Sequence, residues 1–338
     1  MLCCAPRLPS EHRESPSVII DNQQDVTPAV LAEIARADNP RFREIMSIAV
    51  KHLHSFVREA KLTEAEFQQA CGVLASLGQH TTPSHNEVVL AAGSLGISQL
   101  VCLINNGEKG TRETSANMLG PFWRTGAPQM ATGASIAHPS TPGVPLFVKA
   151  WVKDVDGNPV AGAAVDVWHT SAEGYYENQD PQQPDMNLRG IFTTDAEGRI
   201  HFRSVKPAGY PIPVNGPVGE LIRAQHRHNM RPAHVHFLIS KEGFKTQFSQ
   251  VYSGDDPHLE TDVQYGVTRA LIGTYVLHEN EAAPLAGGAA GVAPAIAGPW
   301  YSLDFHFVIE PGLHKMPRAP ITGKAAGPRP AITVLARS

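Results

Sequence analysis

From residue 40 to about residue 106, apolar side chains recur at steps of three and four residues, which is typical of amphipathic helices. The clearest stripe consists of Phe42, Ile45, Ala49, Leu53 and Phe56. Thr63 and Glu66 have the spacing of a capping box and predict the start of a second helix. A third helical run is predicted from about Asn86 to Asn105, before the polar, glycine-containing stretch 106–110.

After about residue 115 the apolar period falls to two and Gly and Pro become frequent, which favours short strands joined by turns. Strands are predicted at residues 146–152, 162–168, 199–203, 231–240 and 301–309. Turn signals such as Asp156-Gly157 separate them. The pattern therefore predicts a mainly β protein with an α-helical N-terminal part, its strands forming a β-sandwich.

The same changes in pattern divide the chain into four segments. We expect a flexible arm at 1–25, a helical N-terminal domain at 26–115, a β-sandwich domain at 116–312 and a Pro/Gly-rich tail at 313–338. Residues 281–299 are rich in Ala, Gly and Pro, which predicts a flexible excursion before the last strand.

Composition limits the possible partners and compartment. The chain has 338 residues, 28 Lys+Arg and 32 Asp+Glu, for a formal charge of -4, which gives no reason to expect nucleic acid or an anionic membrane. We find no stretch apolar enough to span a bilayer and no apolar run of a signal peptide. The four cysteines form no Cys-x-x-Cys pair, so we expect a reduced, cytoplasmic protein.

Two histidines in the predicted strand 231–240 are the first candidates for chemistry. His234 and His236 are one strand step apart, so they share one face of the strand and can hold one metal ion. The same pattern occurs in zinc and cupin-type sites, in which a carboxylate or a third histidine completes the set. His52 and His54 lie in a helical pattern, where residues two apart face different directions, so this pair should not bind one metal ion.

Two tyrosines in loops are the second group of candidates. Tyr176 follows a predicted strand, and Tyr210 lies in a Pro-rich loop. Half-buried tyrosines are commonly core residues, but a phenol can also bind a metal as phenolate. Its pKa of about 10 then requires a strong Lewis acid, and iron(III) suits that best. Arg231 either forms a salt bridge at the strand entry or stabilises negative charge on a substrate.

Several segments together resemble the intradiol ring-cleavage dioxygenases, non-haem iron(III) enzymes that open catechols between their two hydroxyls. The most specific is Arg-Pro-Ala-His-Val-His at 231–236 with both tyrosines upstream. The others are Leu-Gly-Pro-Phe at 119–122, Asp-Gly-Asn-Pro-Val-Ala-Gly-Ala at 156–163, Val-Asp-Val-Trp-His at 165–169, Gly-Tyr-Tyr at 174–176, Leu-Arg-Gly at 188–190, Thr-Asp-Ala-Glu-Gly-Arg at 194–199 and Gly-Tyr at 209–210. The likeness covers about residues 25–312.

The resemblance implies a role for each matching residue. It implies Fe(III) held by Tyr176, Tyr210, His234 and His236. It implies that Tyr210, Arg231 and Gln250 are catalytic, with Tyr210 leaving the metal when the diol binds. The substrate pocket implied by the resemblance is lined by Leu90, Gly93, Met118, Pro121, Phe122, Ile212, Pro213 and Arg231.

The resemblance also implies the partners, and it leaves the substrate open. The helical N-terminus favours the catechol or hydroxyquinol branch, with an aromatic diol and O2 as substrates. The apolar stripe of these helices exceeds what one sandwich face needs, which predicts a homodimer formed through them, and the resemblance implies a phospholipid bound at that interface. Hydroxyquinol enzymes tend to carry Asp where this chain has Gly93, which leaves room and favours a bulkier substituted catechol as an alternative. A transthyretin-like binding sandwich without catalysis is the alternative from another class.

Overall fold

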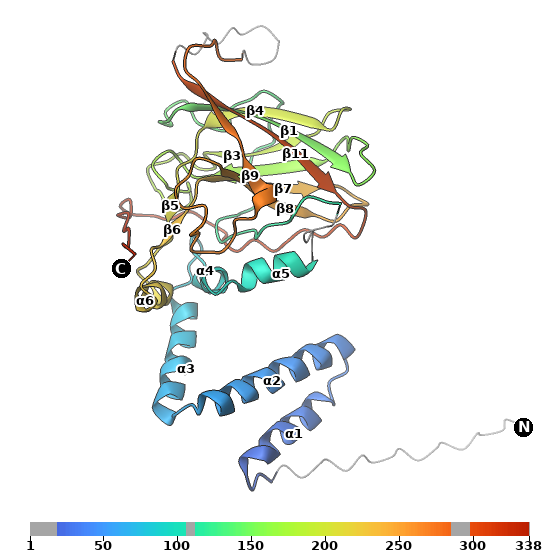
Figure 1. Cartoon of the computed structure of the whole chain (residues 1–338), viewed down its shortest axis with the longest axis vertical. Helices are drawn as coiled ribbons and strands as arrows, with labels where there is room; N and C mark the ends of the chain where they lie inside the picture. Colours follow the sequence, from blue (N-terminus) through green and yellow to red (C-terminus); the bar gives the residue numbers. More distant parts are fainter. Residues whose placement is uncertain (1–18, 106–111, 285–297, 338) are drawn as a thin grey trace, which may run out of the picture. The chain divides into compact units, whose positions relative to one another are not determined.

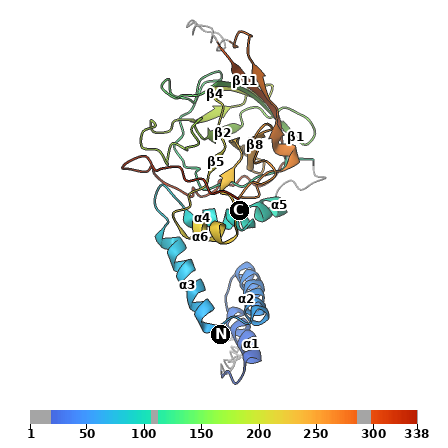
Figure 2. The ribbon, with the colours of Figure 1, turned by 60° about the vertical axis from the view of Figure 1, so that its left-hand side comes forward.

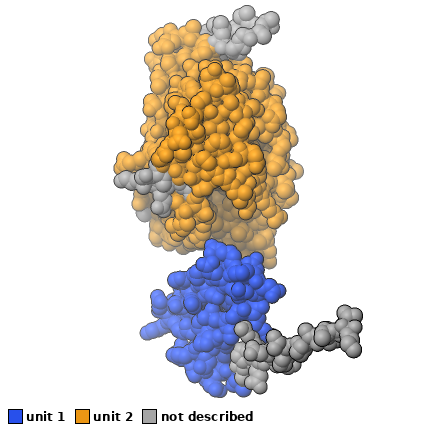
Figure 3. Space-filling view, turned by 90° about the vertical axis from the view of Figure 1, so that its right-hand side faces the viewer, with its two compact units in different colours: residues 1–72 blue, residues 73–338 orange. Residues whose placement is uncertain are grey.

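The computed structural model describes residues 19–105, 112–284 and 298–337, and it consists of two compact units. The first unit comprises Met1–Gly72 and the second Val73–Ser338. Figure 3 colours the two units separately.

The first unit is helical, as the sequence predicts. It contains α1 (Gln23–Ile34), α2 (Pro40–Ala60) and the first part of α3 (Glu64–Gln79). The predicted capping box of α3 is confirmed, because the Glu66 carboxylate accepts from the Thr63 amide at 2.9 Å and the Thr63 hydroxyl accepts from the Glu66 amide at 3.3 Å. α1 begins inside the segment predicted as an arm, and residues 1–18 of that arm lie outside the described residues.

The predicted single helix from Asn86 to Asn105 is wrong, because this run forms two helices of the second unit. They are α4 (Glu87–Ser94) and α5 (Ile97–Asn105), which are bent by 76° at the break between them. Gly96 in that break has a φ of 74°, a left-handed conformation that glycine adopts without strain. Apolar periodicity alone did not reveal this break.

The rest of the second unit is a β-sandwich, which confirms the predicted fold class (Figure 1). Its strands and remaining helices are β1 (Pro145–Asp154), β2 (Ala164–His169), β3 (Arg189–Thr193), β4 (Arg199–Val205), β5 (Tyr210–Pro211), α6 (Pro217–Ala224), β6 (Met230–Arg231), β7 (His234–Ser240), β8 (Gln247–Ser253), η1 (Arg269–Leu271), β9 (Ile272–Gly273), β10 (Tyr275–His278) and β11 (Trp300–Ile309). One sheet has the order β10-β11-β1-β4 and the other β3-β2-β7-β8-β9. β5 and β6 form a separate two-stranded sheet.

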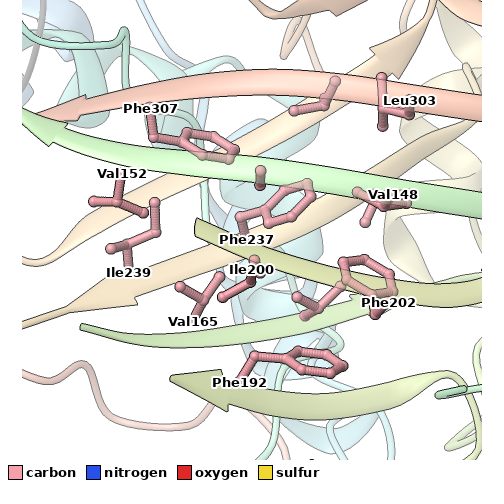
Figure 4. Packing of buried hydrophobic residues seen from close by; sticks show 14 of the residues in the cluster. Val148, Val152, Val165, Phe192, Ile200, Phe202, Phe237, Ile239, Leu303 and Phe307 are labelled. Carbon is pink, nitrogen blue, oxygen red and sulfur yellow. The ribbon is translucent and has the colours of Figure 1, made fainter. Parts of the chain in front are cut away.

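The main core lies between the two larger sheets (Figure 4). Alternate residues of β1 and β7 point into it, among them Val148, Val152, Phe237 and Ile239. Each fully buried side chain of this size contributes about 1.5–3 kcal/mol to folding. This layer fixes the direction in which β7 presents its other residues.

A second apolar cluster lies on the opposite face of the five-stranded sheet, where α4 and α6 pack against each other (Figure 2). The cluster includes Leu90, Phe122, Trp168, Tyr176, Tyr210, Ile212 and Leu238. His234 and His236 alternate with the core residues of β7, so they point to this second face.

The predicted strand 231–240 is wrong at its start. β7 begins at His234, while Arg231 belongs to β6 and pairs with Tyr210 of β5. Pro232 separates the two strands, since proline has no N–H for a ladder. The C-terminal segment packs on the second unit: Ile321 is buried, and Asn229 donates to the Thr333 carbonyl at 2.9 Å.

Among the described residues, no single helix is long and apolar enough to cross a membrane. The bent pair α4 and α5 passes that test of length and composition only when the two are taken together.

Candidate functional site

Three side-chain donor atoms meet on the second face of the five-stranded sheet. The Tyr176 hydroxyl lies 3.0 Å from His236 Nε2 and 3.3 Å from His234 Nε2, and the two Nε2 atoms are 3.1 Å apart. Two ligands that are about 2.1 Å from one ion and at right angles lie about 3 Å apart. The three atoms are therefore spaced as ligands of a single metal ion.

Tyr210 lies beside these three residues on β5. Its ring is perpendicular to that of Tyr176, with centroids 5.2 Å apart, and its centroid is 5.7 Å from that of His234. The register of β5 with β6 places Tyr210 opposite Arg231. The structure thus brings together the four side chains that the sequence singled out.

Both histidines are neutral, and His234 presents an unprotonated Nε2 atom. His234 Nδ1 lies 2.7 Å from the Pro232 carbonyl, which can only accept, so the ring proton is on Nδ1. The His236 ring stacks on Trp168, with centroids 4.5 Å apart and planes at 9°. Burial lowers the pKa of His234 to about 3 and that of His236 well below its ordinary value, so both rings are neutral near neutral pH.

The two phenols fit a highly charged cation. Burial raises the pKa of Tyr176 well above that of a free phenol and also raises the pKa of Tyr210. Neither phenol would ionise here near neutral pH unless a cation compensated the charge. Among the described residues no three His, Cys, Asp or Glu side chains gather to hold a metal, which disfavours a zinc or iron(II) site completed by a carboxylate.

Arg231 is fixed beside this group by a buried hydrogen-bond network. Its guanidinium donates to both carboxylate oxygens of Asp262 at 3.0 Å, and its Nη2 also donates to Gln250 Oε1 and the Tyr252 hydroxyl at 3.0 Å. Burial by itself would lower the pKa of Arg231, but Asp262 outweighs it and raises that pKa above its usual value. The guanidinium is therefore a permanent, immobile positive charge.

Comparison with known proteins assigns the chain to a family. Residues 118–302, more than half of the chain, match the family model described as Dioxygenase, and residues 39–112 match the one described as Catechol dioxygenase N terminus. The chain belongs to the intradiol ring-cleavage dioxygenases. The same comparisons show that its activity is that of an intradiol ring-cleavage dioxygenase.

Individual relatives support this family assignment over most of the dioxygenase. It is 38% identical to a 6-chlorohydroxyquinol 1,2-dioxygenase of Cupriavidus pinatubonensis, over 86% of this chain and 99% of the relative. It is 41% identical to a hydroxyquinol 1,2-dioxygenase of Rhizobium sp., over 73% of this chain and 83% of the relative. The solved structure of a hydroxyquinol 1,2-dioxygenase from Pseudomonas putida superposes with a TM-score of 0.74 at 35% identity, covering 86% of this chain and 99% of that one.

The predicted pocket residues of the dioxygenase gather around the same face. Leu90, Phe122 and Ile212 belong to the apolar cluster that contains both tyrosines, and the Met118 carbonyl accepts from Gln250 Nε2 at 2.6 Å. Ile212 and Pro213 also line a cavity of about 340 Å³ together with Tyr175 and residues 330–333, and the residues that line it do not include the four candidate ligands. Pro121 is buried beside Phe122.

Gly93 does not leave the open space for a larger substrate that the sequence suggested. The side-chain amide of Gln264 fills the space next to it, so that a Cβ atom at position 93 would lie 1.7 Å from Gln264 Oε1. The argument for a bulkier catechol that rested on open space at Gly93 is therefore wrong.

Sequence reasoning missed the residues that hold the dioxygenase site in place. Glu177 accepts two hydrogen bonds from Arg124, both at 3.0 Å, and one from Arg189 at 2.6 Å, which fixes the loop that carries Tyr176. Tyr252 could have been found, because it lies two residues after Gln250 on one strand and so shares its face. Asp262 has no local signal in the sequence.

Proposed function

We propose that this dioxygenase cleaves hydroxyquinol or a catechol between its two adjacent hydroxyls with O2. Both oxygen atoms enter the product, a diacid of the maleylacetate or cis,cis-muconate type, so that atoms balance without another reductant. The observation that carries the proposal is the convergence of the buried side chains of Tyr176, His234 and His236 next to Tyr210. Hydroxyquinol enzymes among the relatives support the substrate class.

The cofactor we propose is non-haem Fe(III), held by Tyr176, Tyr210, His234 and His236. The neutral imidazoles and the phenols that need a strong cation both support this choice. When bound, iron(III) would supply Lewis acidity that draws electron density from the diol.

The chain's own groups prepare the substrate. We assign to Tyr210, as the phenolate that a bound cation would favour, the role of accepting a proton from a diol hydroxyl, since Tyr210 lies at the edge of the group, in the short sheet with Arg231. Arg231 would stabilise negative charge on the ring, because its guanidinium is already oriented by Asp262 and Gln250 and need not reorganise. Leu90, Phe122 and Ile212 would orient the ring and exclude water.

The first test is a visible spectrum of the iron-loaded protein, before and after anaerobic addition of hydroxyquinol and then catechol. Phenolate bound to iron(III) is red, so we expect a broad band that shifts with a cleaved diol. After O2 is admitted, one O2 should be consumed per diol. A colourless iron-loaded protein would contradict the tyrosine ligands, and a coloured protein that cleaves neither diol would contradict the substrate class.

We also propose a cytoplasmic homodimer formed through the N-terminal helices, with a phospholipid bound at that interface. The supporting observation is the apolar stripe of α2, in which Phe42, Leu53 and Phe56 are 51%, 61% and 57% exposed. Exposed apolar stripes of this size are typical of interaction surfaces. Sedimentation and lipid extraction of the purified protein test both parts.

A further inference from the structure

The side chain of Gln264 fills the space that a side chain at position 93 would need. Gly93 lies in α4, although glycine is a poor helix former, so its presence calls for a packing reason. A Cβ atom there would lie 1.7 Å from Oε1 and 2.7 Å from Cδ of Gln264. The amide of Gln264 thus stands where a side chain of residue 93 would begin.

Gln264 is held firmly in this position. Its Nε2 donates to the Ser94 hydroxyl at 2.7 Å and to the Leu90 carbonyl at 3.4 Å, and its side chain is buried. Its backbone amide donates to Asp262 Oδ1 at 3.1 Å. With Nε2 engaged by Ser94 and Leu90, Oε1 is the amide atom nearest to the Cβ position of residue 93.

The surroundings connect this amide to the proposed diol pocket. Leu90 of α4 and Val263 next to Gln264 both pack in the apolar cluster that contains Tyr176 and Tyr210. Asp262, two residues before Gln264, is the carboxylate that orients Arg231. The segment that carries Gln264 is therefore part of the same wall as the charged group of the site.

We infer that Gln264 is a specificity-determining residue whose carboxamide, in place of a side chain at position 93, selects diols that carry a further hydrogen-bonding ring substituent. The inference deepens the proposed function and rests on it. A third ring hydroxyl can donate to Oε1, whereas an unsubstituted ring leaves this buried oxygen without that partner. Sites that offer such an acceptor discriminate against analogues lacking the donor.

The polar part is tested with Gln264→Met, which keeps the length of the side chain and removes the amide. The ratio of kcat/KM for hydroxyquinol to kcat/KM for catechol should fall about tenfold, the effect of one lost hydrogen bond. Gln182→Met, at an exposed position, is the matched control and should leave the ratio unchanged. An unchanged ratio in Gln264→Met, with the wild type cleaving both diols, would overturn the inference and leave the proposed function intact.

The steric part is tested with Gly93→Ala, Gln264→Ala and the double variant. Gly93→Ala alone should displace the amide, lowering both the selectivity ratio and the Tm. In the Gln264→Ala background the same change should have little further effect, because the clash has gone. Equal effects of Gly93→Ala in both backgrounds would contradict the shared space. A wild type that cleaves neither diol would instead overturn the proposed function.

Discussion

The two faces of the five-stranded sheet are both buried, yet they carry different chemistry. One face of β7 supplies Phe237 and Ile239 to the layer between the sheets, and the other supplies His234 and His236 to the site. The histidines of the two faces also differ. His169, the last residue of β2, lies on the apolar face. Its Nδ1 donates to the Thr170 carbonyl, and its Nε2 lies 2.6 Å from the Ser204 hydroxyl. The Nε2 atom of His169 is satisfied by a hydroxyl of the other sheet, whereas the Nε2 atoms of His234 and His236 converge on each other and on Tyr176, which indicates a metal site.

The largest effect should come from removing one donor atom on the site face. Tyr176→Phe should abolish the iron(III) colour and reduce activity to background, because a phenyl ring cannot bind the metal. Visible spectroscopy and iron content measure this. Tyr175→Phe is the matched control, since the Tyr175 hydroxyl donates to the Pro330 carbonyl instead. Loss of colour in the control but not in Tyr176→Phe would reverse the assignment.

A substitution on the apolar face should affect stability. Phe237→Ala removes a fully buried ring that packs against Phe307, with centroids 4.9 Å apart. We expect a loss of about 3–5 kcal/mol in the free energy of unfolding. The iron band of the folded protein should keep its position. Urea denaturation followed in parallel with the spectrum tests the separation of the faces, and a shifted band would show that they are coupled.

The histidine of the apolar face should make stability depend on pH. Burial lowers the pKa of His169 to about 4. Between this value and the unfolded value of about 6.5, the unfolded chain binds a proton that the folded chain does not, so stability falls as pH falls through this window. The loss should reach about 3 kcal/mol at pH 4. Unfolding free energies of wild type and His169→Gln should converge there, and parallel curves would refute this origin.

The smallest of these effects should come from replacing the Arg231 guanidinium by a lysine ammonium, which keeps the charge but loses the hydrogen-bond geometry. Arg231→Lys keeps the positive charge but cannot bind Asp262 through two parallel hydrogen bonds while reaching Gln250 and Tyr252. We expect kcat/KM to fall about a hundredfold, mostly in kcat. Arg203→Lys, on β4 of the other sheet, is the control. A loss confined to KM would mean that Arg231 only helps to bind the diol.

The sequence predicted the apolar face of the sandwich better than its site face. Strands with regular alternation, such as β1 and β7, were found because one side is uniformly apolar. β8 was missed, since Gln247, Ser249 and Gln250 give it a polar appearance although it is buried. The histidines and tyrosines carry motifs, whereas Asp262 meets Arg231 only through long-range folding, which no local pattern encodes.

The short sheet of β5 and β6 has a consequence for motion. It joins only Tyr210–Pro211 to Met230–Arg231, apart from the larger sheets. Two-stranded ribbons of this length open locally at a fraction of the global unfolding free energy, while central strands such as β7 open only with the whole unit. In amide hydrogen exchange, the segment of Tyr210 and Arg231 should therefore exchange earlier than that of His234 and His236. Such opening would move the backbone around Tyr210, while the hydrogen bonds to Asp262 and Gln250 keep the Arg231 guanidinium in place.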